Sequence, residues 1–140
     1  PVLRLFAGIT MAAATTAAFA TPAPINGRWL TQDRDAIVEV GPCGDTICGR
    51  VAKFLVRPPQ GNDQKDTNNP DPKLRNRRLL GMAVVFGLKP DGNQWKGTIY
   101  DPKSGRSYRS VVYLAKNGTL KVKGCFGPIC RGQNWTKSNL

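Results

Sequence analysis

The sequence predicts an all-β fold: an eight-stranded antiparallel up-and-down barrel with one short helix in the loop between its third and fourth strands. Three observations predict it. Eight segments alternate apolar and polar residues with the period of two that is typical of strands. Short connections rich in turn residues join successive segments, which makes them antiparallel neighbours, and a single connection is long. Eight such strands close into a barrel whose interior just holds one small ligand.

The first twenty residues have the pattern of a secretory signal peptide. Arg4 gives a positive start, residues 5–14 form an apolar run without charge, and residues 18–20 (Ala-Phe-Ala) form a small-residue cleavage site. The run is too short to span a bilayer comfortably, and the alternative is a buried N-terminal helix. We therefore expect residues 1–20 to be a signal, residues 21–26 a proline-rich leader, and residues 27–140 a periplasmic or secreted barrel without a transmembrane segment.

The strands are expected, in order, at residues 27–30, 36–40, 47–56, 82–88, 94–100, 106–115, 119–126 and 131–137. The third should carry a bulge, because its alternation changes phase near Ala52. The Asn117-Gly118 pair between two alternating runs is a strong hairpin signal. Leu120 and Val122 share one face of the seventh strand, opposite Lys121 and Lys123, so we expect apolar faces to line the interior and cations to lie outside.

The long connection, residues 57–81, is too long for a plain loop. Asp71 is suited to the N-cap of a helix, Pro72 to its first position and Gly81 to the position just past its end, which predicts a helix of about two turns.

The same loop is rich in Asp and Asn, whose oxygen atoms could bind calcium. No calcium-loop spacing is present, however. We therefore expect its carboxylates to cap backbone amides and to pair with Arg75, Arg77 and Arg78, and we expect no metal.

The four cysteines form two pairs of equal spacing, and spacing alone leaves three pairings open. In an up-and-down meander the first pair brackets the loop after the second strand and the other brackets the loop after the seventh, at opposite ends of the barrel. A disulfide needs Cα atoms within about 7 Å. We therefore predict the local disulfides Cys43–Cys48 and Cys125–Cys130, rather than a redox or zinc site.

The chain contains no histidine, which removes histidine-based triads, His-ligated metals and the usual proton shuttle at neutral pH. An enzyme would have to rely on groups such as Asp66, Asp71, Asp101 and Tyr100 for acid–base chemistry. We expect a non-enzymatic protein with no catalytic residue and no cofactor, and keep a hydrolase-type enzyme as the remote alternative.

The formal net charge is +12, or +11 once Arg4 is removed with the signal. Such a charge is either a solubilising surface or an attraction to anionic partners, such as membrane lipids or lipopolysaccharide-like surfaces. Nucleic acid is not an expected partner, because the basic residues are scattered singly along strands and the chain is expected to be exported.

The Gly27-Arg28-Trp29 motif on the first strand resembles the lipocalin (calycin) signature. The resemblance implies that a basic residue of the last strand packs across Trp29 and plugs one end of the barrel by a cation–π contact. Arg131 is the expected partner, with Arg28 as its competitor.

A broader resemblance covers nearly the whole mature chain. Its motifs are Cys-Gly-Arg-Val at 48–51, the Asp-Thr-Asn-Asn-Pro-Asp-Pro-Lys-Leu-Arg-Asn-Arg-Arg-Leu-Leu-Gly run at 66–81 and Trp-Lys-Gly-Thr-Ile-Tyr-Asp-Pro at 95–102. With these, the chain resembles domain-of-unknown-function family 2147 of exported bacterial proteins. The resemblance implies a calycin-like barrel in the envelope or outside the cell that binds a small apolar ligand, and it implies no known reaction.

The loops after the third, fifth and seventh strands should gather at one end of the barrel and form its mouth, with residues 57–81 as a partial lid. We expect a fatty or amphipathic ligand, its tail on the apolar wall and its anionic head on an arginine of the lid. The candidate ligand-binding residues are Asp66, Asn69, Asp71, Arg75, Arg77, Tyr100 and Tyr108. The alternative is a filled barrel that binds nothing inside and holds an anionic envelope surface with its basic outer wall.

Overall fold

The computed structural model describes residues 2–3, 5, 7–14 and 21–140. Arg4 and the predicted cleavage site at residues 18–20 lie outside the described residues. Residues 7–14 are exposed and belong to no strand or helix. Nowhere in the described part of the chain is there a helix of the length and apolar character that a membrane span requires.

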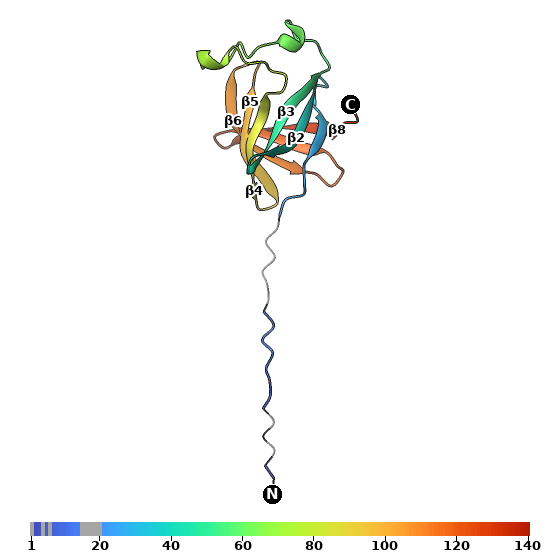
Figure 1. Cartoon of the computed structure of the whole chain (residues 1–140), viewed down its shortest axis with the longest axis vertical. Helices are drawn as coiled ribbons and strands as arrows, with labels where there is room; N and C mark the ends of the chain where they lie inside the picture. Colours follow the sequence, from blue (N-terminus) through green and yellow to red (C-terminus); the bar gives the residue numbers. More distant parts are fainter. Residues whose placement is uncertain (1, 4, 6, 15–20) are drawn as a thin grey trace.

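Eight antiparallel strands form a closed barrel in which each strand pairs with the next and β1 pairs with β8 (Figure 1). This confirms the predicted fold class. The strands are β1 (Gly27–Leu30), β2 (Ala36–Cys43), β3 (Thr46–Phe54), β4 (Ala83–Asp91), β5 (Gln94–Asp101), β6 (Arg106–Leu114), β7 (Leu120–Phe126) and β8 (Ile129–Lys137).

The predicted bulge in β3 lies where the sequence placed it. Val38 pairs with Val51 and Ile37 pairs with Lys53, so Ala52 is the extra residue. The seam that closes the barrel is short, since only Trp29–Lys137 and Leu30–Thr136 pair between β1 and β8.

The barrel interior is filled by a cluster of large apolar side chains. Its buried members are Ile25, Trp29, Val38, Val40, Val85, Leu88, Val112, Leu120, Val122 and Trp135. Tyr108 also belongs to the inner face, because it pairs with Ile99, which packs against this cluster.

The segment before β1 is part of this core. The sequence pattern predicts only a proline-rich leader for residues 21–26. Ile25 is only 1% exposed. The indole Nε1 of Trp29 donates to the Ile25 carbonyl (3.0 Å), and that of Trp95 donates to the Ala23 carbonyl (3.1 Å). Residues 21–26 therefore plug one end of the barrel; we call them the N-terminal plug.

The cation over Trp29 is Lys137, whose Nζ lies 5.0 Å from the ring centroid. The prediction of Arg131 is wrong, because the register of β8 pairs Arg131 with Gly124 and places Lys137 opposite Trp29. Arg28, the competitor, instead forms an ion pair of 2.7 Å with Glu39.

The loop between β3 and β4 contains two short 3-10 turns, η1 (Gly61–Asp63) and η2 (Pro72–Leu74), so the predicted two-turn helix is wrong. Asp71 does cap η2, accepting a hydrogen bond from the Lys73 amide (3.0 Å). The helix stops early because the backbone of its expected second turn pairs across the loop. Arg77 O accepts from the Asp66 amide, and the Leu79 amide donates to Gln64 O, both at 2.9 Å.

The two predicted disulfides, Cys43–Cys48 and Cys125–Cys130, are present. The first joins the facing ends of β2 and β3, and the second joins the facing ends of β7 and β8. Each therefore staples one hairpin.

Candidate functional site

A buried carboxylate links the β3–β4 loop to the barrel wall. Asp66 is 1% exposed and accepts three side-chain hydrogen bonds. They come from the Tyr100 hydroxyl (2.6 Å), the Asn69 amide nitrogen (2.8 Å) and Nε of Arg77 (3.1 Å). Burying a carboxylate is unfavourable unless it is paired and hydrogen-bonded, and here it is both. The cluster of these four side chains, the Asp66 cluster, holds the loop against β5.

Tyr100 reaches this cluster because it faces outward. Its neighbour Ile99 packs on the core, and successive side chains of a strand point to opposite faces. Tyr100 is nevertheless only 6% exposed, because the loop covers it. Burial, the hydrogen bond to Asp66 and the charge of that carboxylate raise the pKa of Tyr100 to about 12, so its hydroxyl stays protonated and donates.

The loop also contacts the turn between β5 and β6. The Asn68 side-chain amide donates to the carbonyls of Pro102 (3.2 Å) and Lys103 (3.1 Å). A Cβ on Gly105 would lie 2.0 Å from the Asn68 carbonyl oxygen, and Gly105 has a φ of +71°. Only glycine permits this close approach.

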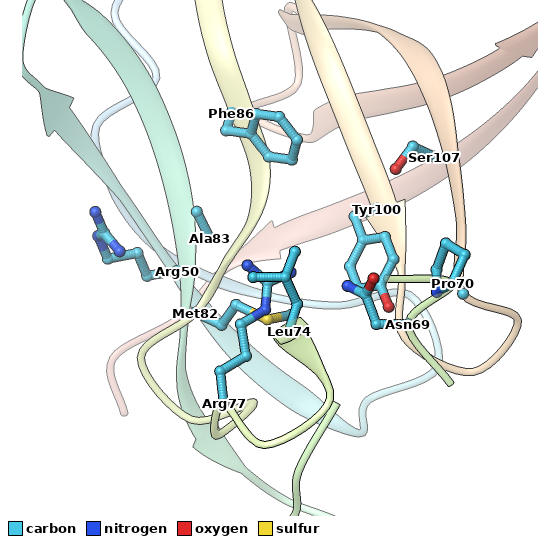
Figure 2. Close-up of a pocket in the computed structure, with 11 residues that line it drawn as sticks. Arg50, Asn69, Pro70, Leu74, Arg77, Met82, Ala83, Phe86, Tyr100 and Ser107 are labelled. Carbon is cyan, nitrogen blue, oxygen red and sulfur yellow. The ribbon is translucent and has the colours of Figure 1, made fainter. Parts of the chain in front are cut away.

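Between the loop and the outer wall lies a partly open hollow of about 490 Å³ (Figure 2). Its lining residues come from the loop and from four neighbouring strands or their ends; they are Arg50, Asn69, Pro70, Leu74, Arg77, Met82, Ala83, Phe86, Tyr100, Gly105 and Ser107. We call this space the outer hollow. Phe86 pairs with Thr98 next to the inward pair Val85–Ile99, which places it on the outside of the barrel.

The outer hollow combines apolar surface with positive charge. Leu74, Met82 and Phe86 contribute the apolar part, and Arg50 and Arg77 contribute the cations (Figure 2). None of its lining residues is acidic. Arg77 is partly neutralised by Asp66, while the hydrogen bonds of Arg50 go to the Gly81 carbonyl and to Sγ of Cys43.

A second hollow, of about 610 Å³, lies on the outer face of β1–β3 and shares Arg50 with the first. Its lining includes Glu39, the partner of Arg28. The carboxylate makes this space less suited to an anion.

The structure brings four of the seven candidate ligand-binding residues into contact: Asp66, Asn69, Arg77 and Tyr100. Two more lie at the edge of this group. Arg75 Nε donates to the Asn69 carbonyl (2.7 Å), and the Asp71 amide donates to Oδ1 of Asn69 (2.9 Å). Tyr108 lies apart, on the inner face of β6.

The sequence interpretation missed the residues that complete the outer hollow, above all Arg50, Met82 and Phe86. Two signals were available. Arg50 belongs to the Cys-Gly-Arg-Val motif, and Phe86 is an aromatic residue at an outward position of its strand.

The remaining acidic residues of the loop are also engaged as expected. Asp63 lies 3.5 Å from Arg78, and Asp71 caps η2. Within the described residues, no group of three or more His, Cys, Asp or Glu side chains is placed to hold a metal ion.

Residues 27–137 match a family model described as an uncharacterized protein conserved in bacteria, DUF2147. The chain belongs to the DUF2147 family. This DUF2147 chain is similar in structure to protein HP1028 of Helicobacter pylori, which is described as belonging to the lipocalin family. The TM-score is 0.69 at 24% sequence identity, over 83% of this chain and 84% of that chain. The similarity shows a lipocalin-like fold for the DUF2147 barrel. No curated protein matches the sequence.

Proposed function

We propose that this DUF2147 protein is an exported binding protein for a small anionic amphiphile, which it holds in the outer hollow. The lipocalin-like barrel is consistent with a binding protein. The proposed site differs from the barrel interior expected from the sequence, because the interior is occupied by the apolar cluster around Trp29 and Trp135.

One observation carries the proposal: two arginines and three large apolar side chains line one concave space without a carboxylate among them. Its volume falls in the range of small-molecule sites, roughly 300–1,000 Å³. The apolar tail would lie on Leu74, Met82 and Phe86, and the anionic head would meet Arg50 and the part of the Arg77 guanidinium beyond Nε.

Export is supported by two further features. The disulfides Cys43–Cys48 and Cys125–Cys130 suit an oxidising compartment outside the cytoplasm. The charge and apolar pattern of residues 1–20 is that of a secretory signal.

Calorimetric titration with dodecanoate, below its micelle concentration, tests the site. Replacing Arg50 with Gln should weaken binding about ten-fold, because a charge-assisted contact is lost. The matched control is Lys53→Gln, an exposed cation of the same strand, which should leave binding unchanged. Dodecanol, which has the same tail without the charge, should bind the wild type more weakly than dodecanoate does.

Phe86→Ser tests the apolar half of the site and should also weaken dodecanoate binding. Tyr108→Leu, on the inner face of β6, serves as its counterpart. Suppose that Arg50→Gln and Phe86→Ser leave the dodecanoate affinity unchanged while Tyr108→Leu lowers it. This result would assign the ligand to the barrel interior and refute the outer hollow as its site.

A further inference from the structure

The turn between β7 and β8 carries two large apolar side chains that the barrel does not cover. Phe126 is 79% exposed and Ile129 is 66% exposed. They face each other across the last pair of the ladder, joined by Gly127 and Pro128. Gly127 has a φ of +56°, which suits the first position of a two-residue hairpin turn. We call residues 126–129 the β7–β8 tip.

The tip is held in this exposed position. The pair next to it along the ladder is the disulfide Cys125–Cys130. From β6, Nη2 of Arg109 donates to the Gly127 carbonyl at 2.5 Å. The disulfide and this hydrogen bond thus hold the backbone of the turn, with Phe126 and Ile129 exposed on it.

The stretch of chain that carries the tip has many basic residues and no acidic one. The last 39 residues, 102–140, contain no Asp or Glu, and their Lys and Arg residues are Lys103, Arg106, Arg109, Lys116, Lys121, Lys123, Arg131 and Lys137. Among the described residues, the one ion pair between this stretch and an acidic side chain joins Lys103 to Asp35. Arg109 and Arg131 flank the tip itself, and the lysines Lys121 and Lys123 follow β7 away from it.

We propose that the β7–β8 tip docks on an anionic phospholipid bilayer. Phe126 and Ile129 enter the boundary between headgroups and acyl chains, while Arg109 and Arg131 meet the phosphates. Two exposed apolar side chains are far too little area for a stable protein–protein interface, which buries roughly 1,200 Å² or more. Apolar anchors beside cations are, in contrast, the usual composition of a peripheral membrane contact.

Co-sedimentation of the full chain with lipid vesicles tests this docking. The wild type should bind vesicles of phosphatidylcholine mixed with phosphatidylglycerol more strongly than vesicles of phosphatidylcholine alone. Arg131→Gln should lower the partition coefficient on the mixed vesicles about five-fold, the usual contribution of one cation at an anionic surface. The control is Lys89→Gln, an exposed lysine near the end of β4 at the opposite end of the barrel.

The double variant Phe126→Ser/Ile129→Ser should lower the same partition coefficient by about ten-fold or more. Its control is Leu140→Ser, which removes a 59% exposed apolar side chain beyond the far end of β8. Every variant carries the same N-terminal residues, so a contribution from those residues to vesicle binding cancels in the comparison. Thermal melting confirms that each variant is folded.

Equal partitioning of the wild type and the double variant would refute the docking, as would equal affinity for the neutral and mixed vesicles. The alternative partner of the tip is a second copy of the chain. Light scattering of the lipid-free protein tests this alternative. A dimer that the double variant dissociates, together with absent vesicle binding, would assign the tip to a second copy of the chain. Neither result bears on the dodecanoate site, because Phe126 and Ile129 do not line the outer hollow.

Discussion

At the scale of single residues, Asp66 decides where the β3–β4 loop lies. Its carboxylate accepts from Tyr100 on the barrel and from Asn69 and Arg77 on the loop. Hydrogen bonds to a buried charge are stronger than neutral ones, and removing one partner leaves the others unsatisfied. The outer hollow depends on this arrangement, because three of its lining residues belong to the Asp66 cluster.

Replacing Asp66 with Ala should therefore lower the free energy of unfolding by about 3 kcal/mol, the lower end of the cost of breaking a buried pair, since Arg77 keeps some access to water. Urea unfolding followed by tryptophan fluorescence measures it. The matched control is Asp63→Ala, whose side chain is 87% exposed and whose pair with Arg78 should contribute less than about 1 kcal/mol. Equal losses in the two variants would mean that Asp66 has no special role.

The raised pKa of Tyr100 predicts a dependence of stability on pH in the alkaline range. Its pKa is about 12 in the folded protein against 10 for an ordinary tyrosine, so the folded state binds the proton more tightly. The stabilisation is complete below about pH 10 and is lost as the pH rises towards 12.

Tyr100→Phe should consequently flatten the fall in the free energy of unfolding between about pH 10 and 12, the range between the ordinary tyrosine pKa and the raised pKa of Tyr100. Absorbance titration at alkaline pH should also lose its step near pH 12 in this variant. An unchanged slope and an unchanged titration curve would contradict the buried hydrogen bond to Asp66.

At the scale of elements, the N-terminal plug is short but belongs to the core. Ile25 fills the space at one end of the barrel, and two indole N–H groups donate to the backbone around it. Each indole would otherwise be a partly or fully buried donor without a partner, which is unfavourable. A chain that begins at Thr21, as the signal pattern predicts, keeps the whole plug.

Ile25→Ala should lower the free energy of unfolding by about 2–4 kcal/mol, the usual cost of truncating a buried isoleucine. The same truncation at Ile129, which is 66% exposed, should change it by less than about 0.5 kcal/mol. Chemical unfolding of both variants makes the comparison. A plug that packs only loosely would give similar small values at both positions.

At the scale of the whole molecule, the barrel is held by its core and its ladders rather than by its crosslinks. Each disulfide joins cysteines five positions apart and so closes only a small loop. Such a loop is worth about 2 kcal/mol by chain entropy, against roughly 4–5 kcal/mol for a long-range crosslink. The continuous apolar interior supplies the cooperative part of the stability.

Replacing both cysteines of either pair with Ser should therefore lower the free energy of unfolding by about 2 kcal/mol and leave the barrel folded. Far-ultraviolet circular dichroism should be unchanged, and thermal melting should report the loss. Trp29→Ala should cost more, about 3–5 kcal/mol, because it empties a core position that is 98% buried. Loss of the β-strand circular dichroism signal in either disulfide variant would show that the barrel depends on its disulfides to fold.

The sequence alone was sufficient for features that depend on neighbouring residues. Alternation of apolar and polar residues located all eight strands, and its phase change located the bulge at Ala52. The positions of the cysteines between these strands then determined their pairing, because only local pairs can meet in an up-and-down barrel. The Asp71 cap was also readable, since it acts within three residues.

The tertiary structure alone decided which distant residues meet. The register between β1 and β8 placed Lys137, not Arg131, over Trp29, and nothing local to either strand specifies that register. The predicted helix stopped after one turn because its backbone groups found partners across the loop. The outer hollow exists because the loop folds onto the outward face of β5, where Tyr100 meets Asp66. Contacts between residues 34 positions apart depend on how the whole chain closes, and local pattern carries no information about them.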